Sequence, residues 1–341
     1  MDTVKIVISP KSVFALIAFL ILMVLIYQIR DVLLLVFASF IIASALYPVV
    51  DWMDKKMPRW LAVLIVYLVG IIVMATILIP FVSVLIEQTR EFFKLAPDYW
   101  KEATNLIYSW KLNFRTIGFS ADLSKIFGLT TYFQQHFLSQ SINFTIAFVE
   151  GILAAFTMAV LVLFLLLDKY ELKRGVFTLF PKEIRHKAEE IAVTISRKVG
   201  GYVRGELLLM VTTGLLTGLF MLMLKVKFAL LLGLLAGIFE IIPIIGPILS
   251  AIPAILITLA QNPSLAVATI LVYLVIHRIE NSVLAPLILG RFLEVHPLII
   301  IIALLVAAST MGVAGIILAP PLAASVYVLV QELYIKKINQ E

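Results

Sequence analysis

The stretch Glu240–Pro253, EIIPIIGPILSAIP, interrupts the apolar run Phe228–Ala260 with one carboxylate, three prolines and one glycine. Proline removes a backbone donor and breaks or kinks a helix, and glycine permits a tight turn. Divided at this point, the run gives two arms of about 15 and 14 residues, each roughly 21–23 Å long, which is less than a bilayer crossing. We therefore expect a re-entrant helical hairpin with its tip at Pro243–Pro247; two kinked spanning helices are the alternative.

The amino-acid composition indicates that lipid surrounds such a hairpin. Hydrophobic residues make up 62% of the 341 residues and charged residues 14%, whereas soluble chains are about 45–50% apolar and about 25% charged. The sequence therefore predicts an all-α integral membrane protein, because a helix satisfies its own backbone groups in lipid. We count about eight hydrophobic segments. Those of a length suited to a span are Val13–Ile29, Val32–Val50, Trp60–Ile86, Ile142–Leu167, Leu207–Leu224, and Leu265–Ile276 extending toward Leu287. The other two, Phe228–Ala260 and Pro297–Val330, are too long and too broken to be simple spans.

Polar inserts divide the chain between these segments. We expect N-terminal transmembrane helices in 1–86, an extramembrane helical insert on the outside in 87–141, a transmembrane helix in 142–167, a cytoplasmic amphipathic helical insert in 168–206, and a C-terminal transport core in 207–335 that contains two broken hydrophobic segments. The amphipathic helix is expected because apolar residues recur every three or four positions from Ile184 to Val203.

The distribution of Lys and Arg predicts the orientation. The short loop Asp51–Arg59 carries three basic residues and the insert Asp168–Glu206 carries nine. Short basic loops remain in the cytoplasm. We therefore expect a multi-pass protein of the cell membrane with a cytoplasmic N-terminus.

A second apolar run, Pro297–Val330, is also interrupted, by the small residues Ser309–Gly315. Paired, interrupted hydrophobic segments in corresponding halves indicate a transporter binding site at mid-membrane. Irregular backbone survives at that depth only inside protein or beside a watery cavity. The predicted pathway for substrate or ion is formed by Glu240, Pro243, Gly246, Pro247, Ser309, Thr310, Gly312 and Gly315.

Glu240 is the ionisable residue closest to the first break. A charged side chain at the centre of a helix in lipid costs roughly 2.5–3.5 kcal/mol, so such residues usually face a cavity and function there. One hypothesis is coupling to H+ or Na+. The alternative is a neutral Glu240 that hydrogen-bonds a neighbouring helix.

Other polar residues at the ends of apolar segments form a predicted gating or structural cluster. Its members are Arg204, Glu206, His277, Arg278, Glu280 and Asn281. They are interpreted either as part of a substrate path or as interfacial ion pairs, which contribute little stability by themselves. For Arg204 and Glu206, local pairing is favoured over contact with a ligand.

The sequence lacks the motifs of several other functions. It has no Walker A pattern, no His-Glu-x-x-His and no Gly-x-Gly-x-x-Gly. It has no cysteine and four histidines, which disfavours a transition-metal site. We therefore expect no enzymatic activity, no cofactor and no bound metal. The net charge of +6 comes from basic residues between apolar runs and carries no nucleic-acid-binding motif, so nucleic acid is not an expected partner.

Four blocks of the C-terminal half resemble the autoinducer-2 exporter (AI-2E) family of permeases. They are GGYVRGELLL (200–209), LLLGLLAGIFEIIPIIGPILSAIPA (230–254), IENSVLAPLILGRFLEVHPLIII (279–301) and GVAGIILAPPLAA (312–324). The resemblance implies a multi-pass exporter of small solutes, with the quorum-sensing signal autoinducer-2 as the family's namesake substrate and sodium/proton antiport in some relatives. It also implies a homo-oligomer in the lipid bilayer. The family often has an aromatic residue where this chain has Ile244, between Pro243 and Gly246.

The leading hypothesis is a secondary transporter that exports a small polar metabolite or signalling molecule, with the small-molecule solute bound between the two broken segments. The alternative is a sodium (cation)/proton antiporter on the same scaffold. A non-transporting scaffold or an intramembrane enzyme is a third class, which the missing catalytic motifs and the two costly breaks disfavour.

Overall fold

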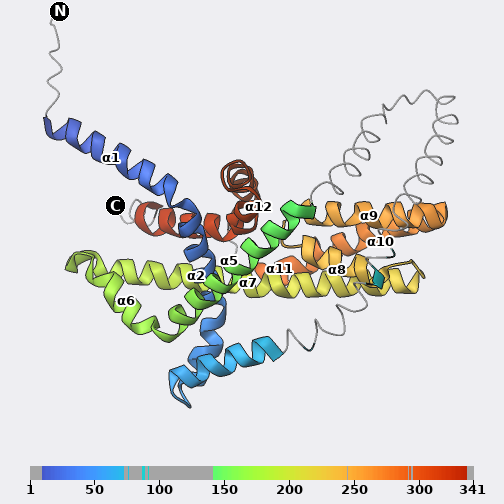
Figure 1. The fold of residues 1–341 in the computed structure, drawn as a ribbon, viewed down its shortest axis with the longest axis horizontal. Coiled ribbons are helices and arrows are strands. Elements are labelled where there is room, and N and C mark those ends of the chain that lie inside the picture. Colours follow the sequence, from blue (N-terminus) through green and yellow to red (C-terminus); the bar gives the residue numbers. More distant parts are fainter. Residues whose placement is uncertain are drawn as a thin grey trace, which may run out of the picture.

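The computed structural model describes residues 10–72, 76, 87–88, 91, 141–243, 245–290, 292 and 295–335, and within them every regular element is a helix (Figure 1). The elements in chain order are α1 (Pro10–Gln28), α2 (Arg30–Asp54), a helix at Arg59–Ile72, α5 (Ser141–Leu167), α6 (Lys169–Thr178), α7 (Lys182–Met223), α8 (Ala229–Phe239), α9 (Ile245–Gln261), α10 (Pro263–Ile279), the π-helix η1 (Glu280–Leu284), α11 (Ala285–Leu289), α12 (Pro297–Val330) and the π-helix η2 (Gln331–Ile335). The outer insert predicted for 87–141 lies almost entirely outside the described residues.

Several of these helices are long and apolar enough to cross a membrane. Four candidate spans lie within the described residues: α2, α7, Pro263–Leu289 and Pro297–Tyr334. A fifth is obtained if Leu153–Leu167 and Lys169–Thr178, which meet at 83°, count as one span. Shorter apolar helices include α8 and α9. The prediction of an all-α integral membrane protein is confirmed.

The N-terminal helices pack together around an ionic junction centred on Arg59. Its Nη1 lies 3.1 Å from Asp51 Oδ1 and 2.9 Å from Asp54 Oδ2, and its Nε donates to the carbonyl of Leu166 at 2.6 Å. Lys169 Nζ lies 2.5 Å from the other oxygen of Asp51. The loop after α2 and the beginning of α6 therefore lie at the same end of the helices.

Helix α7, with 42 residues, is the longest of the described elements. At 1.5 Å per residue it is about 63 Å long, roughly twice the thickness of a bilayer core. Its first half covers the segment for which the sequence predicts an amphipathic helix, and Ile191 and Val199 are buried there. The helix continues without a break through 206 and 207, where the sequence suggested a change from insert to core.

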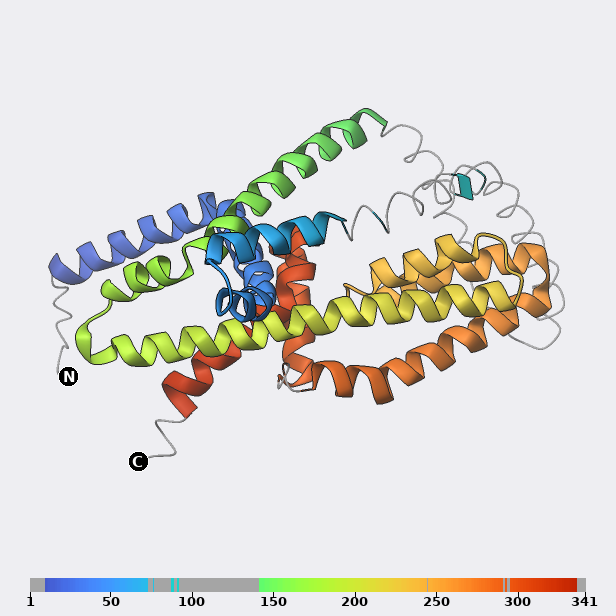
Figure 2. The ribbon, with the colours of Figure 1, turned by 90° about the horizontal axis from the view of Figure 1, so that it is seen from below.

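The second half of α7 packs against α8 through glycine. Gly214 and Gly218 of α7 face Gly233 and Gly237 of α8, and a Cβ added at Gly233 would lie 2.7 Å from the Cα of Gly218. This is the small-xxx-small arrangement that lets helix backbones approach closely in membranes. Figure 2 shows α8, α9 and α10 alongside the second half of α7.

The first break reverses the chain between α8 and α9, as predicted. The two helices pack side by side, and the N–H of Lys227 donates to Gln261 Oε1 at 3.4 Å at their far ends. At the tip, Gly246 N donates to Ile242 O at 2.8 Å. A Cβ at Gly246 would collide with the carbonyl of Phe239, so glycine is required for this close approach.

The second break is a sharp bend at Gly312, which has φ 61° and ψ −144° inside α12. Leu304 and Ala307 before the bend share an apolar cluster with Ala319 after it. In a straight helix Ala307 and Ala319 would be about 18 Å apart. The two arms therefore pack against each other close to the bend, and Figure 1 shows them running in different directions.

Candidate functional site

Three buried carboxylates come together from three different elements. Glu206 belongs to α7, Glu240 caps the end of α8, and Glu280 is the first residue of η1. They are 7%, 4% and 7% exposed. We call these three residues the acid cluster. Acidic side chains are almost never this buried without a partner, so the cluster requires an explanation.

The antiparallel order of the helices brings the cluster together. The chain reverses after α7, after α8 and after α9, so the end of α8 and the end of α10 both return to the middle of α7 (Figure 2). Asn262 fixes the last reversal, since its side chain accepts a hydrogen bond from Ser264 N at 2.9 Å and Pro263 occupies the first turn of α10.

Within the acid cluster, the carboxyl groups of Glu240 and Glu280 contact each other directly. Glu206 accepts a hydrogen bond from the hydroxyl of Tyr202, one turn earlier in α7, and lies within electrostatic range of both other acids. The Oε2 atoms of Glu240 and Glu280 are buried and have no hydrogen-bond partner in the described part of the chain.

The ion pairs of Arg30, Arg59, Lys169 and Lys173 all go to acids outside the acid cluster. Two buried carboxylates in contact repel each other when both are ionised, and removing them from water adds a further cost. Bound protons or a monovalent cation would relieve that repulsion. Over the same described residues, no group of three His, Cys, Asp or Glu side chains has the arrangement to hold a metal ion.

His277 connects the acid cluster to the exposed surface. Its Nδ1 lies 3.8 Å from Glu280 Oε2, and its Nε2 lies 2.9 Å from Nδ2 of the exposed Asn281. The His277 side chain is 43% exposed. The adjoining π-helix η1 is a feature often found at functional sites.

The guanidinium group of Arg204 hydrogen-bonds α2 and not the acid cluster. It donates to the carbonyl oxygens of Ala45 at 2.8 Å and Ser44 at 3.4 Å, both in α2. The interpretation of Arg204 and Glu206 as a local ion pair is therefore replaced by two separate contacts, one to α2 and one to Tyr202. Arg278 is exposed.

The hydroxyl groups predicted for the pathway at the second break make their hydrogen bonds within α12 and not with the acid cluster. The hydroxyl groups of Ser309 and Thr310 donate to the carbonyl of Val306 in their own helix, at 2.9 and 2.8 Å. Helix α12 packs chiefly against α7. A solute path between the two breaks therefore remains a prediction, as do the pathway roles of Pro243 and Pro247 at the first tip.

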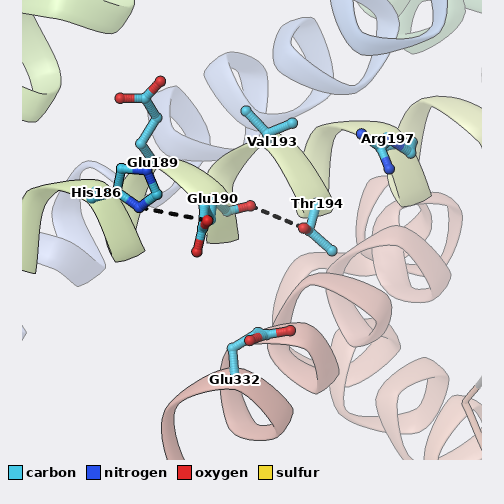
Figure 3. Close-up of a pocket in the computed structure, with 7 residues that line it drawn as sticks. All are labelled: His186, Glu189, Glu190, Val193, Thr194, Arg197 and Glu332. Atoms are coloured by element: carbon cyan, nitrogen blue, oxygen red, sulfur yellow. Dashed lines mark hydrogen bonds and ion pairs between the residues drawn. The ribbon is translucent and has the colours of Figure 1, made fainter.

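The sequence analysis did not anticipate a polar pocket against the first half of α7. Figure 3 shows this pocket, of about 410 Å³. Its lining residues are His186, Glu189, Glu190, Val193, Thr194 and Arg197 of α7 and Glu332 of η2. Its walls include the His186–Glu190 pair at 3.5 Å. The acid cluster begins further along α7, so the pocket and the cluster are distinct.

Comparison with known proteins gives the family. The family described as "AI-2E family transporter" matches residues 16–335. The chain is 30% identical over 307 residues to "Putative transport protein YueF" of Bacillus subtilis, covering 85% of this chain and 82% of that protein. It is 26% identical to "Putative transport protein YrrI" of the same organism (88% and 86% covered) and 24% identical to "Putative transport protein YhhT" of Escherichia coli K12 (87% and 83% covered). The chain therefore belongs to the AI-2E family of membrane transporters.

Proposed function

We propose that the protein is a secondary transporter that exports a small polar metabolite or signalling molecule of the autoinducer-2 kind, and that the acid cluster couples export to proton entry. The observation that carries the coupling is the direct contact between the buried carboxyls of Glu240 and Glu280. A proton bound between them removes the repulsion, and its release restores it, so protonation changes the stability of the contact between α8 and η1.

A change in the contact between α8 and η1 would also affect the backbone at the first break. Glu240 directly precedes the tip between α8 and α9, and Gly246 holds the two helices close. Proton binding would then favour one packing of the α8–α9 hairpin over another, and a ligand shifts such an equilibrium by its difference in affinity for the two states. This link between charge and hairpin position is the proposed basis of coupled transport.

The test uses purified protein in proteoliposomes loaded with autoinducer-2, with an imposed pH gradient and a pH-sensitive dye. We expect wild-type vesicles to release autoinducer-2 faster when the gradient is present, and Glu240→Gln and Glu280→Gln vesicles to lose that acceleration. Glu183→Gln, at an exposed position on the first half of α7, is the matched control. Equal acceleration in all four proteins would exclude the acid cluster from coupling.

A sodium/proton antiporter is the second candidate, favoured by the contact between the buried carboxyls of Glu240 and Glu280, since either a proton or Na+ bound there would relieve their repulsion. The same vesicles without autoinducer-2 discriminate. Sodium-dependent proton flux that Glu240→Gln abolishes supports the antiporter, whereas proton flux that requires autoinducer-2 supports the exporter.

We further propose a cytoplasmic N-terminus in the cell membrane and assembly as a homo-oligomer. The ionic junction supports the orientation, because it places the basic loop after α2 and the basic segment that begins with α6 at one end. A single cysteine at Lys55, in a chain that has none of its own, should react with an impermeant thiol reagent in inverted but not in right-side-out vesicles.

A further inference from the structure

The buried threonines of the core fall into two classes. In one class the hydroxyl donates to a carbonyl of its own helix, as Thr258 does to Ala254 O at 2.8 Å, and this is the usual way a helix satisfies a threonine. In the other class the hydroxyl is buried without a partner in the described structure. Its members are Thr213, Thr217 and Thr269, which are 4%, 1% and 0% exposed.

The unpartnered hydroxyls lie on the same helix faces as the acid cluster. On α7, Thr213 is seven residues after Glu206 and Thr217 is eleven residues after it, so all three share one face at 3.6 residues per turn. On α10, Thr269 is eleven residues before Glu280 and is likewise on its face. The opposite face of α7 is the exposed apolar one, with Leu215 69% exposed.

The two faces also match in register. Helices α7 and α10 run antiparallel and pack against each other (Figure 2), and Glu206 and Glu280 interact at one level. Thr217 lies eleven residues after Glu206 and Thr269 eleven residues before Glu280, so in these antiparallel helices both reach a common level about 16 Å from the acids. At that end of the helices, Gln261 Nε2 is also buried and unpartnered.

Unpartnered hydroxyls in such a row indicate water. A buried polar group without a hydrogen bond costs about 1–3 kcal/mol, and the usual explanation is an ordered water molecule or a functional site. We propose that Thr213, Thr217 and Thr269 line a hydrated file between α7 and α10, which leads from the acid cluster toward the end of α9 and conducts protons to it. The proton-conducting role rests on the coupled transport proposed above; the hydration does not.

Accessibility tests the file itself. The chain has no cysteine, so Thr217→Cys and Thr269→Cys each introduce a single thiol into the full-length protein in membrane vesicles. Thr258→Cys is the matched control, because Thr258 is 0% exposed and its hydroxyl is satisfied. With 2-aminoethyl methanethiosulfonate we expect at least about tenfold faster modification at 217 and 269, since a dry site costs the reagent's polar end 1.4 kcal/mol or more. Equal rates at the three positions would overturn the file.

Hydroxyl removal tests its role. Thr→Val keeps the shape and deletes the donor, so Thr217→Val and Thr269→Val should each slow proton entry about tenfold, the equivalent of one lost hydrogen bond, while Thr258→Val leaves it unchanged. Thr→Ser at 217 and 269 should restore the rate. If Thr269→Val instead raises the unfolding temperature without slowing proton entry, the site is dry and the proposal is wrong. If the cysteines at 217 and 269 are modified rapidly but the protein shows no proton flux, the hydrated file stands and its proton-conducting role is refuted.

Discussion

The guanidinium group of Arg204 in α7 donates a 2.8 Å hydrogen bond to the carbonyl oxygen of Ala45 in α2. It also lies 3.4 Å from the carbonyl of Ser44, the oxygen that loses its helical donor because Pro48 has no N–H. The hydroxyl of Ser196 reaches the Ser44 side chain at 2.9 Å in the same contact. Arg204 therefore compensates for the proline and ties the N-terminal helices to the helix that carries Glu206.

Removing this guanidinium should leave the Ser44 carbonyl without a donor, because Pro48 supplies none. We expect Arg204→Leu to lower the free energy of unfolding by about 1–3 kcal/mol, the cost of an unsatisfied buried polar group. Thermal unfolding in detergent measures the change. In a Pro48→Ala background the helix regains its own donor to Ser44, so Arg204→Leu should cost less there. An identical cost in both backgrounds would show that Arg204 does not act through the proline.

The acid cluster should behave as a unit. Glu240→Gln or Glu280→Gln alone removes the repulsion that proton binding relieves, so each single change should abolish gradient-driven flux and the double change should cost no more. Each substitution should also preserve or raise thermal stability, because a buried charge is removed. Proton flux in vesicles and unfolding temperature are the two measurements. Additive, partial losses of flux would indicate independent sites.

Gly233 lies at the contact between α7 and α8, and Gly70 is a matched control outside that contact. A Cβ at Gly233 would lie 2.7 Å from Gly218 Cα, whereas a Cβ at Gly70 would meet nothing within 4 Å. Gly233→Ala should therefore destabilise by about 1–3 kcal/mol through overpacking, while Gly70→Ala should be neutral or stabilise by up to about 1 kcal/mol through helix propensity. The unfolding temperature should fall in Gly233→Ala and stay the same or rise in Gly70→Ala, and an equal fall in both variants contradicts the assignment.

Gly312 tests the bend in α12. Its φ of 61° and ψ of −144° belong to a region that only glycine adopts easily, although the space around it is open. Gly312→Ala should cost about 1–3 kcal/mol in backbone strain and straighten the run. Spin labels at the exposed positions Ile299 and Val326 would report a longer or broader distance distribution. An unchanged distribution would mean that packing of the two arms, and not glycine, sets the bend.

The contact between α6 and the polar first half of α7 should depend on pH. Lys173 Nζ lies 2.5 Å from Glu189 Oε1, and this hydrogen bond lowers the pKa of Glu189 from its ordinary value of 4.5. A lowered pKa gives stabilisation that is present above about pH 4.5 and is lost as the pH falls through the lowered pKa. Hydrogen exchange in α6 should differ between wild type and Lys173→Met at pH 7, and the difference should vanish at low pH.

The sequence predicts the positions of both breaks because their causes are local. Proline and glycine disrupt a helix wherever they stand, and the chain turns at 240–246 and at Gly312. The N-terminal junction is different. That Pro48 frees the Ser44 carbonyl can be read from the sequence, but the choice of Arg204 as its partner depends on how α7 crosses α2.

The acid cluster could be predicted only in part. Glu240 and Glu280 each stand out as acids in apolar surroundings, but their contact depends on three successive reversals and on the lengths of α8, α9 and α10. One usable signal was missed. The spacing of Gly214 with Gly218 and of Gly233 with Gly237 indicates two helices in close contact, which would have placed α8 on α7.

The π-helix at Glu280–Leu284 changes the angular phase of everything that follows it. Its single widened turn contains one more residue than an α-turn, which rotates the next segment by about 100° around the axis. Glu280 can thus point inward while Ile288 and Leu289, a few residues later, pack against Gly205 of α7, where a Cβ would collide with them. Deleting one residue from 281–284 would close that widened turn. The deletion and the closed turn cancel in angular phase, so Glu280 and Ile288 would stay on one face of the helix and both contacts would survive.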